Sequence, residues 1–338
     1  MLSRVPLLNR LDPFLVAILA TVAVAALLPA DGSALDAFTL ASKLAIALLF
    51  FLYGARLSTR EAVHGLKHWR LHLIILATTF VLFPLLGLAA SALTPWLLTD
   101  PLYLGVLYLC LLPSTVQSAT ALVAVARGNV PGAIVSASAS NILGIAVTPL
   151  LVSATMAVQG AAPDASAVRE ILLMLLAPFL AGQLLRGRRP GRRGQDGHRD
   201  RSLGALVARH RGWLALVDRG AILLVVYVAF SRGMNEGIWS TLSPVRLLGL
   251  AVVCLALLGL VMAATWYGSR LLGFSPADRV AILFCGSTKS LATGLPMAVV
   301  LFPGEPIGLI VLPLMLFHQL QLLVGAALAP RLEADVPT

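Results

Sequence analysis

A lysine with hydroxyl neighbours stands in the middle of a long apolar segment. Residues 285–298 read CGSTKSLATGLPMA, and Lys289 is flanked there by Ser287, Thr288 and Ser290. About twelve residues, roughly 18 Å of helix, separate Lys289 from either end of the segment, whereas a lysine stem reaches about 6 Å. A charge within the bilayer costs at least about 2.5 kcal/mol, so the ammonium is expected to face a cavity or a polar partner. These residue types could bind an anionic solute or a set of hydrogen-bond acceptors.

Catalysis and metal binding are the alternative chemistries, and the sequence argues against both. A lysine can activate a neighbouring serine as a nucleophile, but no G-x-S-x-G elbow or aspartyl pair accompanies Lys289. The three cysteines, Cys110, Cys254 and Cys285, lack the spacing of a metal site or a disulfide framework. We therefore predict a binding protein without a metal site or an organic cofactor, and not an enzyme.

A second polar stretch, PSTVQS at 113–118, interrupts an earlier apolar segment. Proline removes a backbone donor and frees carbonyl groups one turn back, and a bilayer tolerates free carbonyls only against protein or a wet cavity. We predict that the helix unwinds here, although the hydroxyls could instead bond to their own helix and bend it. The polar side chains at this predicted break are Ser114, Thr115, Gln117 and Ser118.

Two further apolar segments carry polar residues that could face the breaks. Ser136 and Ser140 are four residues apart and share one helix face, and Asn141 follows them. Close helix packing is the alternative role for these small residues. His318, Gln319 and Gln321 form the other strongly polar group, in the last apolar segment, and His318 and Gln319 are the predicted site residues among them.

The three N–H donors of the Lys289 ammonium allow several roles. They could hold together the freed carbonyls, Gln117 and the hydroxyls of residues 136–140. Alternatively, the ammonium attracts an anionic substrate directly, or releases its proton in one conformation and couples transport to protons. Lys43, in another apolar segment, lies closer to a membrane edge and is expected to reach the interface.

The overall composition predicts the helices that must position these residues. Of the 338 residues, 59% are hydrophobic and 12% are charged, whereas a soluble domain has about 25% charged residues. A membrane-spanning helix needs about 20 mainly apolar residues, and we predict ten such spans in an all-α membrane protein. None of the 15 acidic residues falls in the interior of a predicted span: Glu170, Asp218, Asp278 and Glu305 lie within the first five residues of theirs. The spans are approximately 13–30, 39–56, 71–94, 101–126, 131–157, 168–186, 214–231, 246–270, 277–301 and 305–328.

The basic residues predict the orientation of these spans. With the N-terminus inside, 20 of the 25 Lys and Arg residues are cytoplasmic and three are outside, which agrees with the positive-inside rule and places both termini in the cytoplasm. The charges gather in loops, which indicates lipid headgroups and not nucleic acid as partners. The Gly- and Arg-rich stretch 187–212 is expected to be a cytoplasmic linker, with lipid or partner binding as the alternative.

The two halves of the chain correspond to each other. Five predicted spans lie in residues 10–158 and five in residues 164–330, and a polar break falls in the fourth span of each half. Because five is an odd number, the second half enters the membrane in the opposite orientation. This pattern is typical of inverted-repeat transporters with broken helices, and we predict that the two broken spans cross near mid-membrane.

The chain resembles the bile acid:sodium symporter superfamily, specifically its SBF-like branch. The resemblance rests on LPSTVQSA followed by ARGNV in spans four and five, GSTKSLATGLPMA in span nine and FHQ in span ten, and it covers residues 10–330. It implies a core domain of spans three to five and eight to ten, and a panel domain of spans one, two, six and seven. It also implies that His318, Gln319 and Lys289 stand where the family has polar residues near the substrate cavity.

The resemblance further implies a secondary active transporter of a small organic, anionic solute in a bacterial inner membrane, working by alternating access. Relatives that depend on sodium carry E-x-G-x-Q-N in span nine, where this chain has Phe284, Gly286, Thr288 and Lys289. Without a carboxylate in the interior of any predicted span, we expect transport largely independent of sodium, by proton coupling or uniport. The alternative is a non-transporting regulator of membrane ion homeostasis on the same fold.

Overall fold

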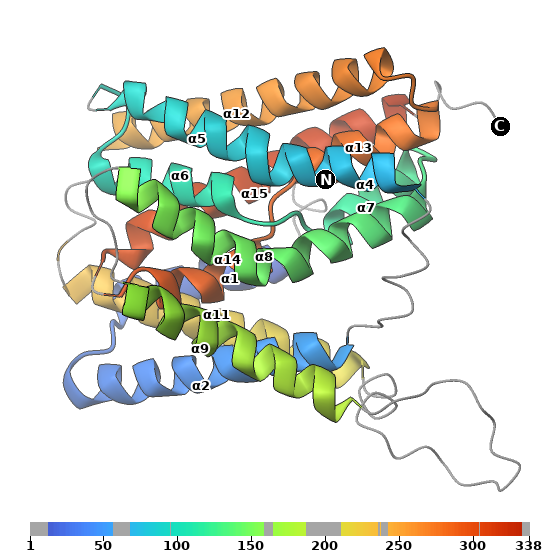
Figure 1. Cartoon of the computed structure of the whole chain (residues 1–338). Helices are drawn as coiled ribbons and strands as arrows, with labels where there is room; N and C mark the ends of the chain where they lie inside the picture. Colours follow the sequence, from blue (N-terminus) through green and yellow to red (C-terminus); the bar gives the residue numbers. More distant parts are fainter. Residues whose placement is uncertain are drawn as a thin grey trace, which may run out of the picture. The chain divides into compact units, whose positions relative to one another are not determined.

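The structure is a computed structural model that describes residues 13–56, 68–94, 96–158, 165–186, 211–235, 237, 243–303 and 305–332. The described residues form helices and connecting turns, with no strand among them, and each of the ten predicted spans contains helix (Figure 1). The elements are α1 (Pro13–Leu27), α2 (Gly32–Arg56), α4 (Trp69–Ala77), the π-helical turn η3 (Thr78–Leu82), α5 (Phe83–Ala89), the 3₁₀ turn η4 (Ala90–Leu93), α6 (Asp100–Leu111), α7 (Gln117–Val125), α8 (Val130–Val158), α9 (Ala165–Leu185), α11 (Arg211–Asn235), α12 (Pro244–Leu271), α13 (Pro276–Ser287), α14 (Leu291–Leu301) and α15 (Ile307–Leu332).

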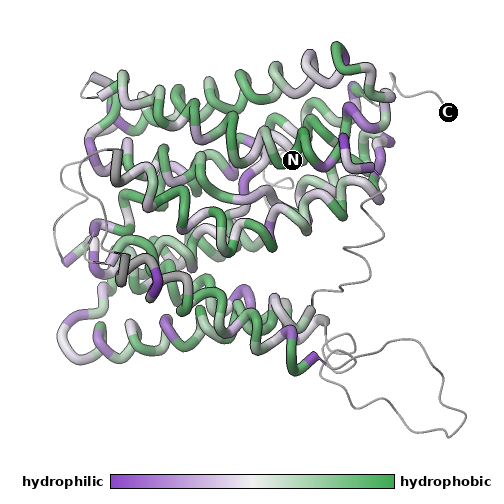
Figure 2. Tube along the Cα trace, in the orientation of Figure 1, coloured by the Kyte–Doolittle hydropathy of each residue, from purple (hydrophilic) through white to green (hydrophobic). Residues whose placement is uncertain are grey.

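Seven helical stretches of the described chain are long and apolar enough to cross a membrane. Figure 2 shows apolar residues along most of the helix lengths and hydrophilic residues concentrated towards the helix ends. The apolar parts of α1, α6 and α9 are shorter, so the number of ten spans remains a prediction, while the all-helical membrane class is confirmed. The seven stretches are 32–55, 69–93, 130–155, 212–235, 244–271, 276–301 and 307–332.

The chain divides into two compact units, which we describe separately. Unit 1 comprises residues 1–57, 178–241 and 305–308. It contains α1, α2, the C-terminal part of α9 and α11, and α11 packs against both α1 and α2. Unit 2 comprises residues 58–177, 242–304 and 309–338 and holds the remaining helices.

Within unit 1, α2 and α9 approach each other through two glycines. A Cβ at Gly54 would collide with the carbonyl of Phe179, and a Cβ at Gly182 would collide with the carbonyl of Phe51. Gln183 Nε2 donates to Gly54 O at 2.6 Å beside this contact. Small residues let helix backbones come this close in a membrane, where packing and interhelical hydrogen bonds drive association.

Within unit 2, the stretch 276–301 that forms α13 and α14 lies in the interior. Buried residues make up 94% of its most apolar 18-residue window, against 28–56% for the other six stretches. It is also the least apolar of the seven. Its polar groups are therefore surrounded by protein and not by lipid, which is the condition under which a bilayer tolerates them.

Three predictions fall on residues that the structure does not describe. The basic linker expected at 187–212 lies outside the described residues as far as residue 210, and the two chain ends, 1–12 and 333–338, lie outside them as well. The predicted linker and the predicted cytoplasmic termini therefore stay predictions.

Candidate functional site

Both spans that were predicted to unwind are interrupted in unit 2. α6 ends at Leu111 and α7 begins at Gln117, while α13 ends at Ser287 and α14 begins at Leu291. The prediction of two interrupted spans is confirmed.

The residues at each interruption explain why the helix stops. Leu112 is extended, with φ −78° and ψ 155°, because a residue before a proline is disfavoured in the helical region; Pro113 also lacks an N–H. At the second break Thr288 is extended, with φ −97° and ψ 148°. Ser290 then caps α14, since its Oγ accepts from Thr293 N at 3.2 Å.

The two interruptions lie against each other. Ser290 N donates to Pro113 O at 2.9 Å, and Ser114 Oγ donates to Cys285 O at 2.6 Å. The two broken spans therefore meet at their breaks, although the breaks are more than 170 residues apart in the chain.

Every carbonyl from residue 110 to residue 114 at the first break has a specific donor. An unsatisfied carbonyl in hydrocarbon costs several kcal/mol, so this complete pairing lets an unwound backbone persist within an apolar segment. The donors are Lys289 Nζ to Cys110 O at 3.1 Å, Thr148 Oγ1 to Leu111 O at 2.9 Å, Lys289 Nζ to Leu112 O at 2.7 Å, Ser290 N to Pro113 O at 2.9 Å and Asn141 Nδ2 to Ser114 O at 2.6 Å.

Lys289 is completely buried, and its ammonium ends among backbone carbonyls. Besides Cys110 O and Leu112 O, Nζ donates to Thr79 O at 3.1 Å. It also lies 4.0 Å from the ring centroid of Phe83, a cation–π arrangement. Three acceptors match the three N–H groups of an ammonium, whereas a neutral amine has two and would leave one carbonyl without a donor.

The π-helical turn η3 makes one of these carbonyls available. Phe83 N donates to Thr78 O, five residues back. In that register residue 84 would donate to Thr79 O, but Pro84 has no N–H. Thr79 O therefore lacks a backbone donor and accepts from Lys289 instead. Such π turns are frequent at functional sites.

The backbone of Lys289 is held by a side chain from α15. Gln321 is buried; its Oε1 accepts from Lys289 N at 2.8 Å and its Nε2 donates to Lys289 O at 3.1 Å. Nε2 also lies 2.8 Å from Nδ1 of His318. His318 was a predicted site residue, and Gln321 was not. Their spacing of three residues on one helix face could have identified Gln321.

Two predicted hydroxyls bond to their own helix. Ser287 Oγ donates to Leu283 O at 2.6 Å and Thr288 Oγ1 donates to Phe284 O at 2.8 Å. Thr288 Oγ1 also lies 3.4 Å from Ser114 Oγ. In this conformation Ser287 and Thr288 complete the last turn of α13.

Two of the three predicted residues of α8 reach the breaks. Ser140 Oγ accepts from Ser114 N at 3.0 Å, and Asn141 donates to the carbonyl of the same serine. Asn141 Oδ1 also accepts from Thr293 Oγ1 at 2.8 Å, so this amide connects both breaks. Ser136 lies elsewhere, with its Oγ 2.6 Å from Nδ1 of a histidine in α4.

Lys289 holds freed carbonyls, as predicted, but the expectation that it would also hold Gln117 and the hydroxyls of residues 136–140 is wrong. Backbone carbonyls take all three of its N–H donors, because they are the groups left without partners by the breaks. The side chain of Gln117 is exposed at the start of α7.

The remaining predicted site residues are Thr115, Ser118 and Gln319. Ser118 Oγ donates to Thr115 Oγ1 at 3.2 Å in the first turn of α7. Gln319 Nε2 is buried and has no hydrogen-bond partner among the described residues. A buried donor without a partner is costly.

Further residues of the site were not among the predicted site residues. Thr79 and Phe83 surround the ammonium, and Tyr108 OH donates to Gly294 O at 2.7 Å, joining α6 to α14. A tyrosine hydroxyl in an apolar helix needs a partner when buried, and this was the available signal for Tyr108.

The site concentrates positive charge and hydrogen-bond donors inside a membrane-spanning unit. Lys289 supplies a full charge, and α7 and α14 both begin at the breaks, where helix N-termini carry partial positive charge. Among the described residues, no three His, Cys, Asp or Glu side chains gather to hold a metal ion. Such an arrangement can bind and release an anionic or hydrogen-bonding solute.

Comparisons with known proteins agree with this geometry. The model of the SBF-like CPA transporter family matches residues 12–334. The chain is 49% identical over 322 residues to "Uncharacterized protein PA2026" of Pseudomonas aeruginosa, covering 95% of this chain and 92% of the relative. It is 46% identical over 325 residues to "Putative symporter YfeH" of Escherichia coli, covering 96% and 94%.

A more distant relative is "Sodium/bile acid cotransporter 7" of Rattus norvegicus, 29% identical over 336 residues, covering 96% of this chain and 93% of the relative. The resemblance noted from the motifs is confirmed along nearly the whole chain. The chain therefore belongs to the SBF-like CPA transporter family and is a membrane transporter.

Proposed function

We propose that the protein is a secondary active transporter that moves a small organic, anionic solute by alternating access. The observation that carries the proposal is the pair of interrupted helices that meet around the completely buried ammonium of Lys289. Discontinuous helices near mid-membrane form the substrate sites of many transporters. We place the solute at these breaks, with Gln117 and Gln319 as candidate donors and Ser118, whose O–H already donates to Thr115, as a candidate acceptor.

Electrostatics favours an anion at this position. The contacts of the ammonium are carbonyls and an aromatic ring, so its charge is not neutralised by them. For an anion about 8 Å from the ammonium, at an effective dielectric constant of about 20, the attraction between the two unit charges is roughly 2 kcal/mol. The N-termini of α7 and α14 add to this attraction.

We further propose that Lys289 serves as a fixed cation, so that no sodium ion is needed to organise the breaks. Carbonyl oxygens also coordinate small cations, and here the ammonium occupies three of them. The solute then moves by uniport, or its movement is coupled to protons. Proton coupling requires another conformation in which one N–H of the ammonium loses its carbonyl acceptor and that proton is released.

The proposal includes the repeat architecture. We assign residues 10–158 and 164–330 to two inverted five-helix repeats, because a break falls in the fourth span of each. Unit 2 would then serve as the core domain and unit 1 as the panel domain. A structure trapped in the opposite access state, with the helices of each unit unchanged internally, would support this assignment.

Transport in proteoliposomes tests the proposal. A thermal-shift screen of small organic anions first selects a radiolabelled solute. Uptake is then measured with an imposed sodium gradient, a proton gradient, a membrane potential or none of these. We expect uptake without sodium, and we expect Lys289→Met to abolish it. Lys43→Met, at an exposed position on α2, is the matched lysine control and should retain uptake.

Two results would overturn the proposal. Uptake that requires sodium and survives Lys289→Met would remove the fixed-cation role. Absence of uptake under all four conditions, with a solute that still shifts the unfolding temperature, would favour the non-transporting regulator.

A further inference from the structure

Three arginines flank the turn between α12 and α13 in unit 2. Arg70 Nη2 donates to Leu272 O at 3.2 Å, and its guanidinium lies 5.3 Å from the ring centroid of Phe274. The guanidinium of Arg279 lies 4.2 Å from the ring centroid of Trp266. Arg270 is four residues after Trp266, one turn along the same face of α12.

The acidic residue of this turn has its own partners. Asp278 Oδ1 accepts from Asn129 Nδ2 at 2.7 Å, and its Oδ2 accepts from Ser275 Oγ at 2.8 Å. Three guanidinium groups and one carboxylate leave a net charge of +2 at the turn. The Nε atom of Arg279 is buried and has no hydrogen-bond partner among the described residues.

Capping of α12 accounts for only part of this cluster. Arg70 uses one of its five N–H donors on the last turn of the helix, a common role for a basic residue at a helix C-terminus. Arg270 is exposed, and Arg279 is stacked on a ring. Among the described residues, most donors of the cluster have no hydrogen-bond partner and are open to a ligand with several oxygen acceptors.

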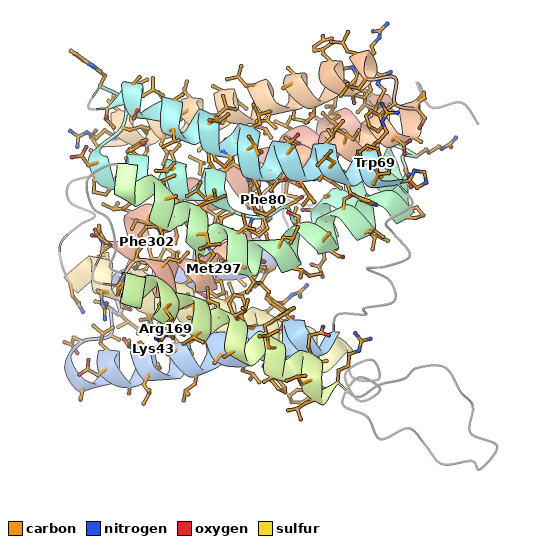
Figure 3. All side chains as sticks on the ribbon, in the orientation of Figure 1. Lys43, Trp69, Phe80, Arg169, Met297 and Phe302 are labelled. Atoms are coloured by element: carbon orange, nitrogen blue, oxygen red, sulfur yellow. The ribbon has the colours of Figure 1, made fainter. Side chains whose placement is uncertain are left out.

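The surroundings of the turn are those of a membrane–water interface. α12 is an apolar helix of 28 residues, long enough to span a bilayer, and the turn follows its end. Trp69, at the start of α4 (Figure 3), is 63% exposed, and Tyr267 is 62% exposed. Exposed Trp and Tyr rings are typical of the headgroup level. Leu271, 88% exposed beside them, offers a surface for an acyl chain.

We propose that the α12–α13 turn, with Arg70, Arg270 and Arg279, is a binding site for the phosphate of an anionic glycerophospholipid. Guanidinium groups match phosphate oxygens through paired N–H donors. Basic sites at helix ends bind the headgroups of anionic lipids. The site lies apart from the helix breaks and requires no assumption about the transported solute.

Lipid titration of the intact protein tests the site. The purified chain in detergent is titrated with phosphatidylglycerol or with phosphatidylcholine of the same acyl chains, and bound lipid is counted by native mass spectrometry. We expect tighter binding of phosphatidylglycerol, weakened by added salt. One arginine near an anionic lipid surface contributes about 1 kcal/mol, so Arg270→Gln should weaken binding about fivefold and Arg70→Gln/Arg270→Gln about 25-fold.

Arg246→Gln is the matched control, because Arg246 is exposed in the first turn of the same helix, at its opposite end. The control should bind phosphatidylglycerol as the unaltered chain does. Equal affinity for the two lipids, or an equal loss in the control, would overturn the proposal. Displacement of phosphatidylglycerol by an equal concentration of glycerol 1-phosphate would also overturn it, since the site would then bind the phosphate group without the lipid. If the double variant does not fold, the single Arg270→Gln decides the result.

Discussion

Replacing Pro84 by alanine would return a backbone N–H beside the carbonyl that Lys289 uses. In the π register of η3 this N–H points at Thr79 O, where the ammonium now donates at 3.1 Å. The two donors would compete for one carbonyl. The effect of Pro84→Ala on stability should therefore depend on whether the ammonium is present.

The size of this dependence follows from the two hydrogen bonds involved. A hydrogen bond to a charged group contributes about 1.5–3 kcal/mol, and a neutral one contributes about 0.5–1.5 kcal/mol. Pro84→Ala also recovers up to about 3 kcal/mol of helix propensity. In the unaltered chain these gains are offset by loss of the hydrogen bond from Lys289 Nζ to Thr79 O. In Lys289→Met that hydrogen bond is already absent, so the full gain should be observed. We expect a coupling free energy of about 1.5–3 kcal/mol.

A double-mutant cycle measures this coupling. The unfolding free energy is determined in detergent micelles for the unaltered chain, Pro84→Ala, Lys289→Met and the double variant. Pro178→Ala, at a proline inside α9, provides a control cycle with Lys289→Met that should be additive. If the effects of Pro84→Ala and Lys289→Met add within about 0.5 kcal/mol, the competition for Thr79 O does not occur and our explanation of η3 is wrong.

Three other outcomes can be checked with the same stability assay. Gln321→Leu leaves the backbone N–H and carbonyl of Lys289 without partners and should cost about 2–6 kcal/mol. Gln319→Leu, on the same helix, removes an unpaired amide and should cost nothing; equal losses would contradict this difference. Gly182→Ala should destabilise by about 1–3 kcal/mol through overpacking, whereas Gly220→Ala, with open space around it, should stabilise by about 0.5–1 kcal/mol. Replacing sodium by potassium should leave the unfolding midpoint unchanged, and a clear rise in sodium would reveal a sodium site that our reasoning excludes.

The local chemistry of the sequence was sufficient to predict where the helices break. Pro113 lacks a donor and restricts Leu112, so the first interruption follows from neighbouring residues. The second was predicted from the polar residues around Lys289, and the structure adds that Ser290 caps α14 there. The burial of Lys289 was also predictable, because a charge at the middle of a span is too far from either interface to reach water.

Hydrogen-bond partners were predicted less well. The sequence suggested the freed carbonyls, Gln117 and the serines of α8 as partners of Lys289. The structure pairs the ammonium with backbone carbonyls alone. Gln321 was noted as part of a polar group, but its bonds to the backbone of Lys289 were not predicted.

There is a physical reason why the sequence predicts the breaks but not the hydrogen-bond partners. Lipid offers no hydrogen bonds, so the sequence alone determines that each polar group of a break must find a partner within the protein. Which partner it finds depends on how segments far apart in the chain pack, as when Ser114 reaches Cys285. The π register that exposes Thr79 O depends likewise on tertiary structure, because the proline permits a free carbonyl but the fold decides that an ammonium meets it.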